Sequence, residues 1–327
     1  MPTSSHSLRL IALSALMCCH LTAPSAEETK PEGALRIASG PTGKIYELMV
    51  RDMQSVCGNT VPLRSVTSTG GLLNLSLLSS SEADLGIVQV DTLRDMKAGD
   101  ENIQLLQAVM PLHNNLLHVL ALTEGSMVDV KRVPLTDVIV PYSGSRVTVR
   151  RFSELKGLSV AVVGSAQLMG QKLEGQLGYG MKLLIAETDD EALALLRANK
   201  VQAVFTLGGW PLPTVARHTV SAGLTLVEFD LSPQAPYVVV KRNYQKLDAF
   251  NRTFLAVPNL LLTRPFKAGG AIGKQVSVLQ SCLRQRIDEL QEGRYQAAWK
   301  EIKDVDNTYG VAAVTTRPAQ NAKAAKP

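Results

Sequence analysis

Three stretches of the sequence combine glycine with hydroxyl or amide side chains directly after a predicted β-strand. They are Ser39 to Gly43, Thr67 to Gly71 and Gly164 to Gln167. Glycine lets a ligand approach the backbone, and the N-terminus of a following helix offers free N–H groups and a partial positive charge. One such stretch alone is most often a helix cap. Three of them after strands, where open α/β sheets bind their ligands, predict a site for a small molecule with carboxylate or phosphate groups.

Two further polar residues follow the third predicted strand. Gln89 and Asp91 either hydrogen-bond the ligand or cap the next helix, and the sequence favours neither role. With them, the ligand contacts expected from these stretches are Ser39, Gly40, Thr42, Gly43, Ser68, Thr69, Gly70, Gly71, Gln89, Asp91, Ser165 and Gln167.

The residues that catalysis would need are not arranged for it. No stretch has the glycine spacing of a nucleotide-binding loop, and His113, His118 and His218 have no metal-ligand spacing with Cys, Asp or Glu. Ser153 to Lys156 matches the S-x-x-K pattern, but its companion motifs are missing, so a helix cap is the better interpretation. We expect no enzymatic activity, no catalytic residue, no cofactor and no metal.

Composition limits the class of protein. The 327 residues contain 34 Lys and Arg against 29 Asp and Glu, and 45% are hydrophobic. This length and apolar fraction predict about two globular domains. The charge of +5 is not gathered into a basic stripe, which argues against nucleic-acid binding. The only long apolar stretch is at the N-terminus, which argues against a polytopic membrane protein.

The N-terminus has the pattern of an export signal. Arg9 precedes the apolar segment Leu10 to Cys19, and Ala26 ends a stretch of small residues. We expect residues 1–26 to be removed and the protein to be periplasmic. Because Met17 precedes Cys18, a soluble protein is favoured over a lipid-anchored one.

Two cysteines remain after the signal, Cys57 and Cys282. In an oxidising compartment such a pair suggests one disulfide closing a very long loop, although two separate buried thiols are the alternative.

The elements that position these residues alternate between short apolar strands and helices, which predicts an α/β fold with a mostly parallel sheet. The predicted strands are Leu35–Ser39, Val61–Val66, Ala83–Gln89, Leu105–Met110, Leu116–Leu122, Leu158–Val163, Lys182–Ala186, Val201–Leu207 and Leu224–Phe229. Residues 127–149 have no helical period and predict a hairpin-like excursion. Residues 271–305 predict a long helical region, and residues 313–327 a disordered tail.

The order of these motifs resembles the TAXI family of solute-binding proteins, which serve tripartite ATP-independent periplasmic (TRAP) transporters. The similar segments are Leu35 to Tyr46 (LRIASGPTGKIY), Thr67 to Leu75, Ser81 to Gln89 (SEADLGIVQ), Ser153 to Ser165, Phe205 to Gly209 (FTLGG) and Val257 to Leu261 (VPNLL). The resemblance spans about Ala34 to Ile302.

This resemblance implies a type II periplasmic binding protein fold, an α/β fold of two lobes joined by two crossovers. One lobe would comprise residues 34–123 and 257–312, and the other residues 124–256, with 127–149 as an insertion. Cys57 and Cys282 would then share one lobe. The family's binding positions add Tyr46, Gly208 and Gly209 to the expected ligand contacts.

The function that the resemblance implies is an extracytoplasmic receptor. It would be a monomer that captures a small anionic solute, such as an amino acid or organic acid, for the membrane permease subunits of a TRAP transporter. The alternative is an exported ligand sensor or scaffold of the same fold without a dedicated permease. An enzyme on this fold is disfavoured because acid, base and metal groups are missing.

Overall fold

The computed structural model describes residues 33–97, 99–132, 139–267 and 269–314. The predicted signal, residues 1–26, lies outside them, as does most of the predicted tail.

One mixed sheet of ten strands runs through the structure. Its order is β2 (Leu63–Val66), β1 (Leu35–Ala38), β3 (Leu85–Gln89), β12 (Ala249–Thr263), β4 (Gln107–Leu122), β9 (Ala203–Gly208), β7 (Ser159–Val163) and β8 (Lys182–Ala186), with β10 (Leu224–Leu226) beside β4 and β11 (Val238–Tyr244) beside β12. The outer strands pair in parallel, whereas β4 and β12 pair antiparallel to each other and to their neighbours. The predicted α/β class is confirmed, but the sheet is mixed rather than mostly parallel, because the two long strands β4 and β12 and the strands beside them pair antiparallel.

Helices cover both faces of this sheet. They are α1 (Ile45–Cys57), α2 (Gly71–Ser79), α3 (Val90–Met96), α4 (Glu101–Gln104), α5 (Ala166–Leu177), α6 (Asp189–Arg197), α7 (Pro213–Ala216), α8 (Ala271–Gln285) and α9 (Ile287–Glu292). Helix α1 illustrates their origin, because Met49, Met53 and Val56 recur at helical spacing and all three are buried.

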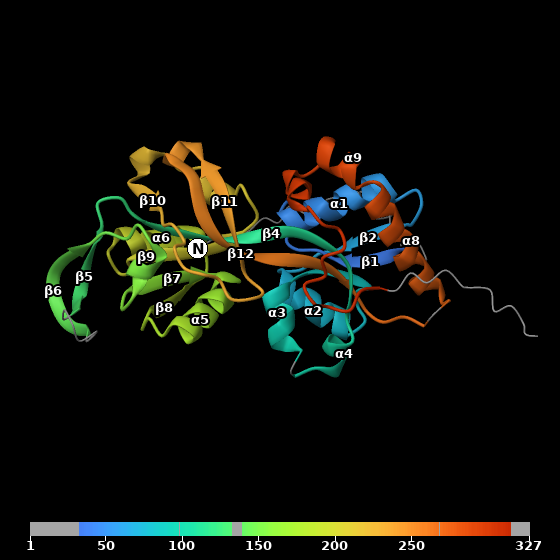
Figure 1. Cartoon of the computed structure of the whole chain (residues 1–327), viewed down its shortest axis with the longest axis horizontal. Coiled ribbons are helices and arrows are strands. Elements are labelled where there is room, and N and C mark those ends of the chain that lie inside the picture. The colour runs from blue at the N-terminus through green and yellow to red at the C-terminus, as the bar shows by residue number, and fades with distance from the viewer. Residues whose placement is uncertain (1–32, 98, 133–138, 268, 315–327) are drawn as a thin grey trace, which may run out of the picture. The chain divides into compact units, whose positions relative to one another are not determined.

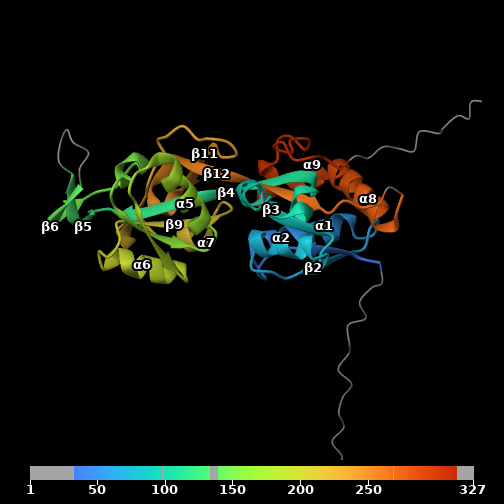
Figure 2. The same cartoon turned by 90° about the horizontal axis from the view of Figure 1, so that it is seen from below.

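The buried apolar residues form two pairs of clusters. One pair surrounds β1 and β3, with α1, α8 and α9 on one face and α2, α3 and α4 on the other. The second pair surrounds β7 and β9, with α5 on one face and α6 and α7 on the other. We call these groups of elements the first lobe and the second lobe. Figures 1 and 2 show the two groups with β4 and β12 extending into both, which confirms the two-lobed arrangement with two connecting strands.

The two connecting strands change lobe within their length. On β4, Leu112 belongs to a first-lobe cluster and Leu116 to a second-lobe cluster. On β12, Val257 belongs to the second lobe and Leu260 to the first. The packing therefore divides inside these strands rather than at their ends.

Several predicted element boundaries were wrong. Leu105–Met110 and Leu116–Leu122 were expected as two strands, but one strand, β4, runs from Gln107 to Leu122 and leaves out only Leu105 and Leu106. Both β11 and the long β12 were missed as strands. The helical region 271–305 is divided into α8, α9 and a 3₁₀ turn at Ala297–Glu301.

The excursion at residues 127–149 is a hairpin. Its strands, β5 (Ser126–Arg132) and β6 (Ile139–Val147), pair antiparallel in a two-stranded sheet separate from the main one. At the other end, two residues expected in the disordered tail are ordered: Ala313 bridges Ala108, and the Val314 N–H donates to the Ala108 carbonyl at 3.0 Å.

A disulfide joins Cys57, at the end of α1, to Cys282 in α8, with Cα atoms 6.1 Å apart. It ties together two helices on the same face of the first lobe.

Candidate functional site

The first two glycine-rich turns lie at one edge of the sheet in the first lobe. Strands β1, β2 and β3 are mutually parallel through β1, so the turns that follow them share the carboxyl edge. Asn74 fastens them together: its side-chain amide donates to the carbonyl oxygens of Ser39 at 2.6 Å and Ile87 at 2.7 Å, and its Oδ1 accepts from the Ser68 hydroxyl at 2.5 Å. Asn74 was not among the predicted site residues. Its role depends on contacts between segments far apart in the sequence.

The turn at Ser39 to Gly43 already holds a carboxylate. Gly43 has φ of +74° and its N–H donates to Oε2 of Glu47 at 3.1 Å, while Glu47 is buried and pairs with Arg51. Ser39 is buried and bonded to Ser65, whereas Thr42 is exposed. Of this turn, the Thr42 hydroxyl is free to meet a ligand and the Gly43 N–H is engaged.

The turn at Thr67 to Gly71 is built in a similar way. The Gly70 N–H donates to the Ser68 hydroxyl at 3.1 Å, and Gly70 has φ of +128°, a conformation that glycine alone adopts readily. A Cβ on Gly71 would lie 3.7 Å from the Gln89 nitrogen, which shows how closely this turn approaches β3. Thr69 is exposed.

Gln89 and Asp91 are both buried. Thr92 donates to Gln89 through its hydroxyl at 3.2 Å, and to Asp91 through its backbone N–H at 2.6 Å. Oδ2 of Asp91 accepts a hydrogen bond from the hydroxyl of Tyr237, in the second lobe, at 3.1 Å. Burial raises the pKa of Asp91 above its ordinary value, although Lys172 and these hydrogen bonds oppose the shift. Asp91 therefore joins the two lobes through Tyr237, which sequence reasoning missed.

A second contact between the lobes lies beside Asp91. Lys172, on α5, places its Nζ 2.7 Å from Oδ1 of Asp95 and 3.1 Å from the carbonyl oxygen of Asp91. A lysine in the middle of an amphipathic helix gives no sequence signal of such a contact.

Tyr46 lies where the connecting strands cross between the lobes. Its hydroxyl donates to Oδ1 of Asn259 on β12 at 2.5 Å and accepts from Nδ2 of Asn115 on β4 at 2.8 Å. Burial raises the pKa of this hydroxyl. Both hydrogen bonds of the Tyr46 hydroxyl therefore go to the connecting strands, and this hydroxyl does not face an open site.

The turn after β9 approaches the same crossing. A Cβ on Gly209 would lie 2.5 Å from Cδ1 of Ile45 and 3.2 Å from Cδ2 of His113, so a side chain here would have to displace the end of Ile45 and press on the His113 ring. Gly208 lies against Leu212. Gly209 thus brings the second lobe against the start of α1, next to the turn at Ser39 to Gly43.

Ser165 and Gln167 stand at the N-terminus of α5. Ser165 is exposed and Gln167 half-buried, and neither side chain bonds another described residue. These two side chains, with Thr42 and Thr69, are the predicted contacts that remain available as donors and acceptors for a ligand.

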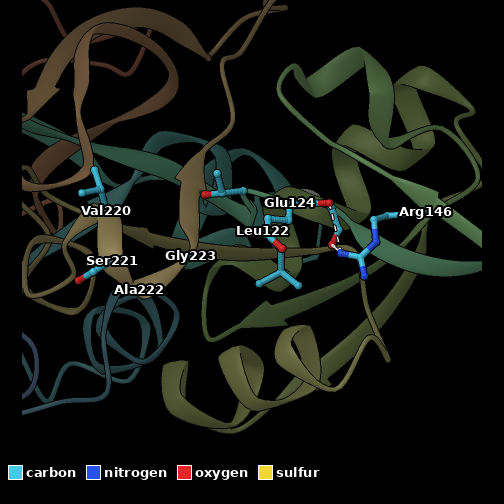
Figure 3. A pocket seen from close by; sticks show the side chains of 9 residues that line it. Leu122, Glu124, Arg146, Val220, Ser221, Ala222 and Gly223 are labelled. Carbon is cyan, nitrogen blue, oxygen red and sulfur yellow. Dashed lines mark hydrogen bonds between the residues drawn. The ribbon is translucent and has the colours of Figure 1, made fainter.

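A separate hollow of about 400 Å³ lies at the far end of β4, lined by Leu122, Thr123, Glu124, Gly125, Arg146, Val220, Ser221, Ala222 and Gly223. Figure 3 shows its Arg146 turned back on the chain, donating to the carbonyl oxygens of Glu124 at 3.3 Å and Gly125 at 3.2 Å. None of the predicted ligand contacts lines this hollow.

Two kinds of feature are absent from the described residues. They contain no group of three or more His, Cys, Asp or Glu residues placed to hold a metal ion. No helix among them combines the length and apolar character needed to cross a membrane.

No protein-family model and no curated protein matches the sequence. One solved structure with a similar arrangement is Tv2483 bound to L-arginine, which is 11% identical over 79% of this chain and 87% of that one, with a TM-score of 0.48. Another is the GluR0 ligand-binding core with L-glutamate, which is 15% identical over 79% of this chain and 96% of that one, with a TM-score of 0.46. A third is an amino acid ABC transporter substrate-binding protein from Streptococcus pneumoniae bound to L-arginine. It is 15% identical over 82% of this chain and 93% of that one, with a TM-score of 0.46.

Proposed function

We propose that the protein is an extracytoplasmic solute receptor, without enzymatic activity, that holds a small organic solute between its two lobes. The observation that carries this proposal is the convergence of the first two glycine-rich turns on one sheet edge, with contacts from the second lobe reaching the same edge through Lys172 and Tyr237. The solute would contact both lobes when they are closed on it and only one lobe when they are open. It would therefore bind the closed state better and shift the balance toward that state.

The finer proposal is an anionic amino acid or organic acid delivered to a TRAP-type permease from the periplasm. The free hydroxyls of Thr42 and Thr69 and the N-terminus of α5 at Ser165 support an acidic ligand, because they offer hydrogen-bond donors. The buried Glu47 disfavours a second negative charge directly at the Gly43 N–H. The acidic group would therefore lie toward α5 and the threonines.

Calorimetry tests the receptor function. Protein unfolded, freed of bound solute and refolded would be titrated with amino acids, dicarboxylates and oxo-acids, and we expect heat with at least one. Thr42→Val combined with Thr69→Val should weaken that binding about tenfold, as expected for two hydrogen bonds. Thr60→Val, at an exposed residue between α1 and β2 whose hydroxyl bonds no described residue, is the matched control. Absence of heat with every solute would contradict the proposal.

A second candidate, an exported sensor or scaffold, is favoured by the β5–β6 hairpin. It forms its own two-stranded sheet outside the main sheet, and such an excursion offers a surface to a partner protein. The two candidates differ in their gene neighbours: permease subunit genes would favour transport, and a sensor kinase gene would favour signalling.

A further inference from the structure

Lys172 brings a positive charge from the second lobe to the ligand edge of the first. Its Nζ is 3.1 Å from the carbonyl oxygen of Asp91. Asp91 is the second residue after β3 and so lies at the carboxyl edge of the sheet. The same Nζ pairs with Asp95 at 2.7 Å. The ammonium group is thus held at the boundary between the lobes by two groups of α3.

Helix geometry places Lys172 on the ligand side of α5. Ser165 and Lys172 are seven residues apart, about two turns, so they share one face of the helix. Side chains of a helix lean toward its N-terminus, which directs the lysine toward the end that carries Ser165. One face of α5 therefore combines a helix N-terminus with a cation, and both favour an anion.

The present partners of Lys172 differ in how readily they can be replaced. The side chain of Lys172 is 21% exposed and that of Asp95 is 38% exposed. The carboxylate of Asp95 can return to water if the pair opens, whereas the backbone carbonyl of Asp91 is fixed in place by helix α3. An incoming carboxylate could take the place of Asp95 and leave the lysine paired.

We propose that Lys172 binds a carboxylate group of the solute and that Asp95 is its partner only in the ligand-free protein. This inference rests on the proposed receptor function and adds a specificity residue to it. A solute without a carboxylate would either leave the ion pair of Lys172 and Asp95 in place, or break it without giving Lys172 a new anionic partner. The exchange thus selects for carboxylic acids.

The rival explanation is a clasp, in which the pair serves only to hold the lobes together. The two roles predict different directions of change in solute affinity when Lys172 and Asp95 are each replaced. If Asp95 competes with the solute for Lys172, Lys172→Met weakens binding and Asp95→Asn strengthens it. If the pair is a clasp, both substitutions break the same contact and change the affinity in the same direction.

The test is calorimetry with succinate, pyruvate and L-glutamate, using whichever binds the wild-type protein best. We expect Lys172→Met to raise the Kd at least tenfold, the effect of losing a charged hydrogen bond, and Asp95→Asn to lower it a few-fold. The double variant should match Lys172→Met, and Lys172→Arg should bind within a few-fold of wild type. Lys182→Met, an exposed lysine on β8, is the control for overall charge.

Circular dichroism would establish that each variant is folded, with Lys172→Gln as the replacement if Lys172→Met is not. This inference is overturned if Lys172→Met leaves the Kd of the wild-type protein unchanged, or if Lys172→Met and Asp95→Asn shift the Kd in the same direction. Either result leaves the receptor function standing. No binding of any carboxylate by the wild-type protein would overturn both.

Discussion

The hydroxyl group of Tyr46 donates a hydrogen bond to Oδ1 of Asn259 at 2.5 Å and so joins helix α1 to the connecting strand β12. Asn115 of β4 donates to the same hydroxyl, and Asn259 in turn donates to the carbonyl oxygen of His113 at 2.9 Å. One side chain therefore ties the helix that follows the first glycine-rich turn to both strands that connect the lobes. A shift of α1 on ligand binding would reach both strands directly.

Replacing Tyr46 with Phe should lower the free energy of unfolding by about 1 to 3 kcal/mol, because a buried acceptor on Asn259 and a buried donor on Asn115 lose their partner. Urea unfolding measures the change. Tyr179→Phe is the control, since the hydroxyl of this half-buried tyrosine bonds no described residue. Equal effects of the two substitutions would show that the hydroxyl of Tyr46 contributes nothing.

The same crossing explains which features the sequence could and could not reveal. The glycine-rich turns were recognisable because positive φ at Gly43 and Gly70 requires glycine whatever lies around them. Strand β4 was divided in the prediction because polar residues from His113 to Asn115 interrupt its apolar run. In the structure, two distant segments satisfy these polar groups: the Tyr46 hydroxyl accepts from Asn115, and the Asn259 side-chain amide donates to the His113 carbonyl.

Contacts between the lobes were the least predictable part. Lys172 and Tyr237 reach α3 only because two α/β units fold against each other, and neither residue belongs to a local pattern. Local sequence reports turns, helix faces and strands, whereas these pairings depend on tertiary packing. The placement of the first two glycine-rich turns at one sheet edge was therefore predictable, whereas the contacts that the second lobe makes at that edge were not.

Stability should fall as the pH decreases below about 6.5. Burial lowers the pKa of His113 to about 4 and that of His118 to about 3, so in this range the unfolded chain binds protons that the folded chain does not. The stabilisation is complete above 6.5 and is lost toward pH 4 and 3, by about 1.4 kcal/mol per pH unit for each histidine. When the pH falls from 7 to 5, the two histidines together should lower the free energy of unfolding by about 4 kcal/mol.

Urea unfolding at several pH values checks this slope, and His118→Gln should remove part of it. Asp91 acts in the opposite direction, because its raised pKa makes its ionisation unfavourable in the folded protein. His218→Gln, at a less buried position, should change the slope less. A slope that His118→Gln leaves intact would contradict the assignment.

Asp84 should be among the most sensitive positions in the first lobe. Its carboxylate is buried and accepts from the Nε and Nη2 groups of Arg36 and from Nη2 of Arg264, at 2.8 to 3.1 Å. Burial favours a raised pKa for Asp84, but the hydrogen bonds from Arg36 outweigh it and the pKa is lowered. Asp84→Asn should cost about 3 kcal/mol, the lower end for breaking a buried ion pair, since both arginines are partly exposed.

The comparison for Asp84 is the ion pair of Asp190 with Arg217, in which the Asp190 side chain is 76% exposed. Asp190→Asn should cost less than about 1 kcal/mol. Chemical denaturation of both variants gives the two values. Similar losses would mean that burial does not set the strength of these pairs.

The disulfide between Cys57 and Cys282 should be the strongest single constraint on the unfolded chain, because it closes a loop with a sequence separation of 225. In the chain-entropy model such a loop stabilises the fold by about 5 kcal/mol. Cys57→Ala combined with Cys282→Ala should therefore lower the unfolding temperature, and reductant should have no further effect on that variant. Thiol titration of denatured protein spanning residues 27–327 should find free thiols only after reduction. An equal thiol count with and without reductant would show that the two cysteines are not joined.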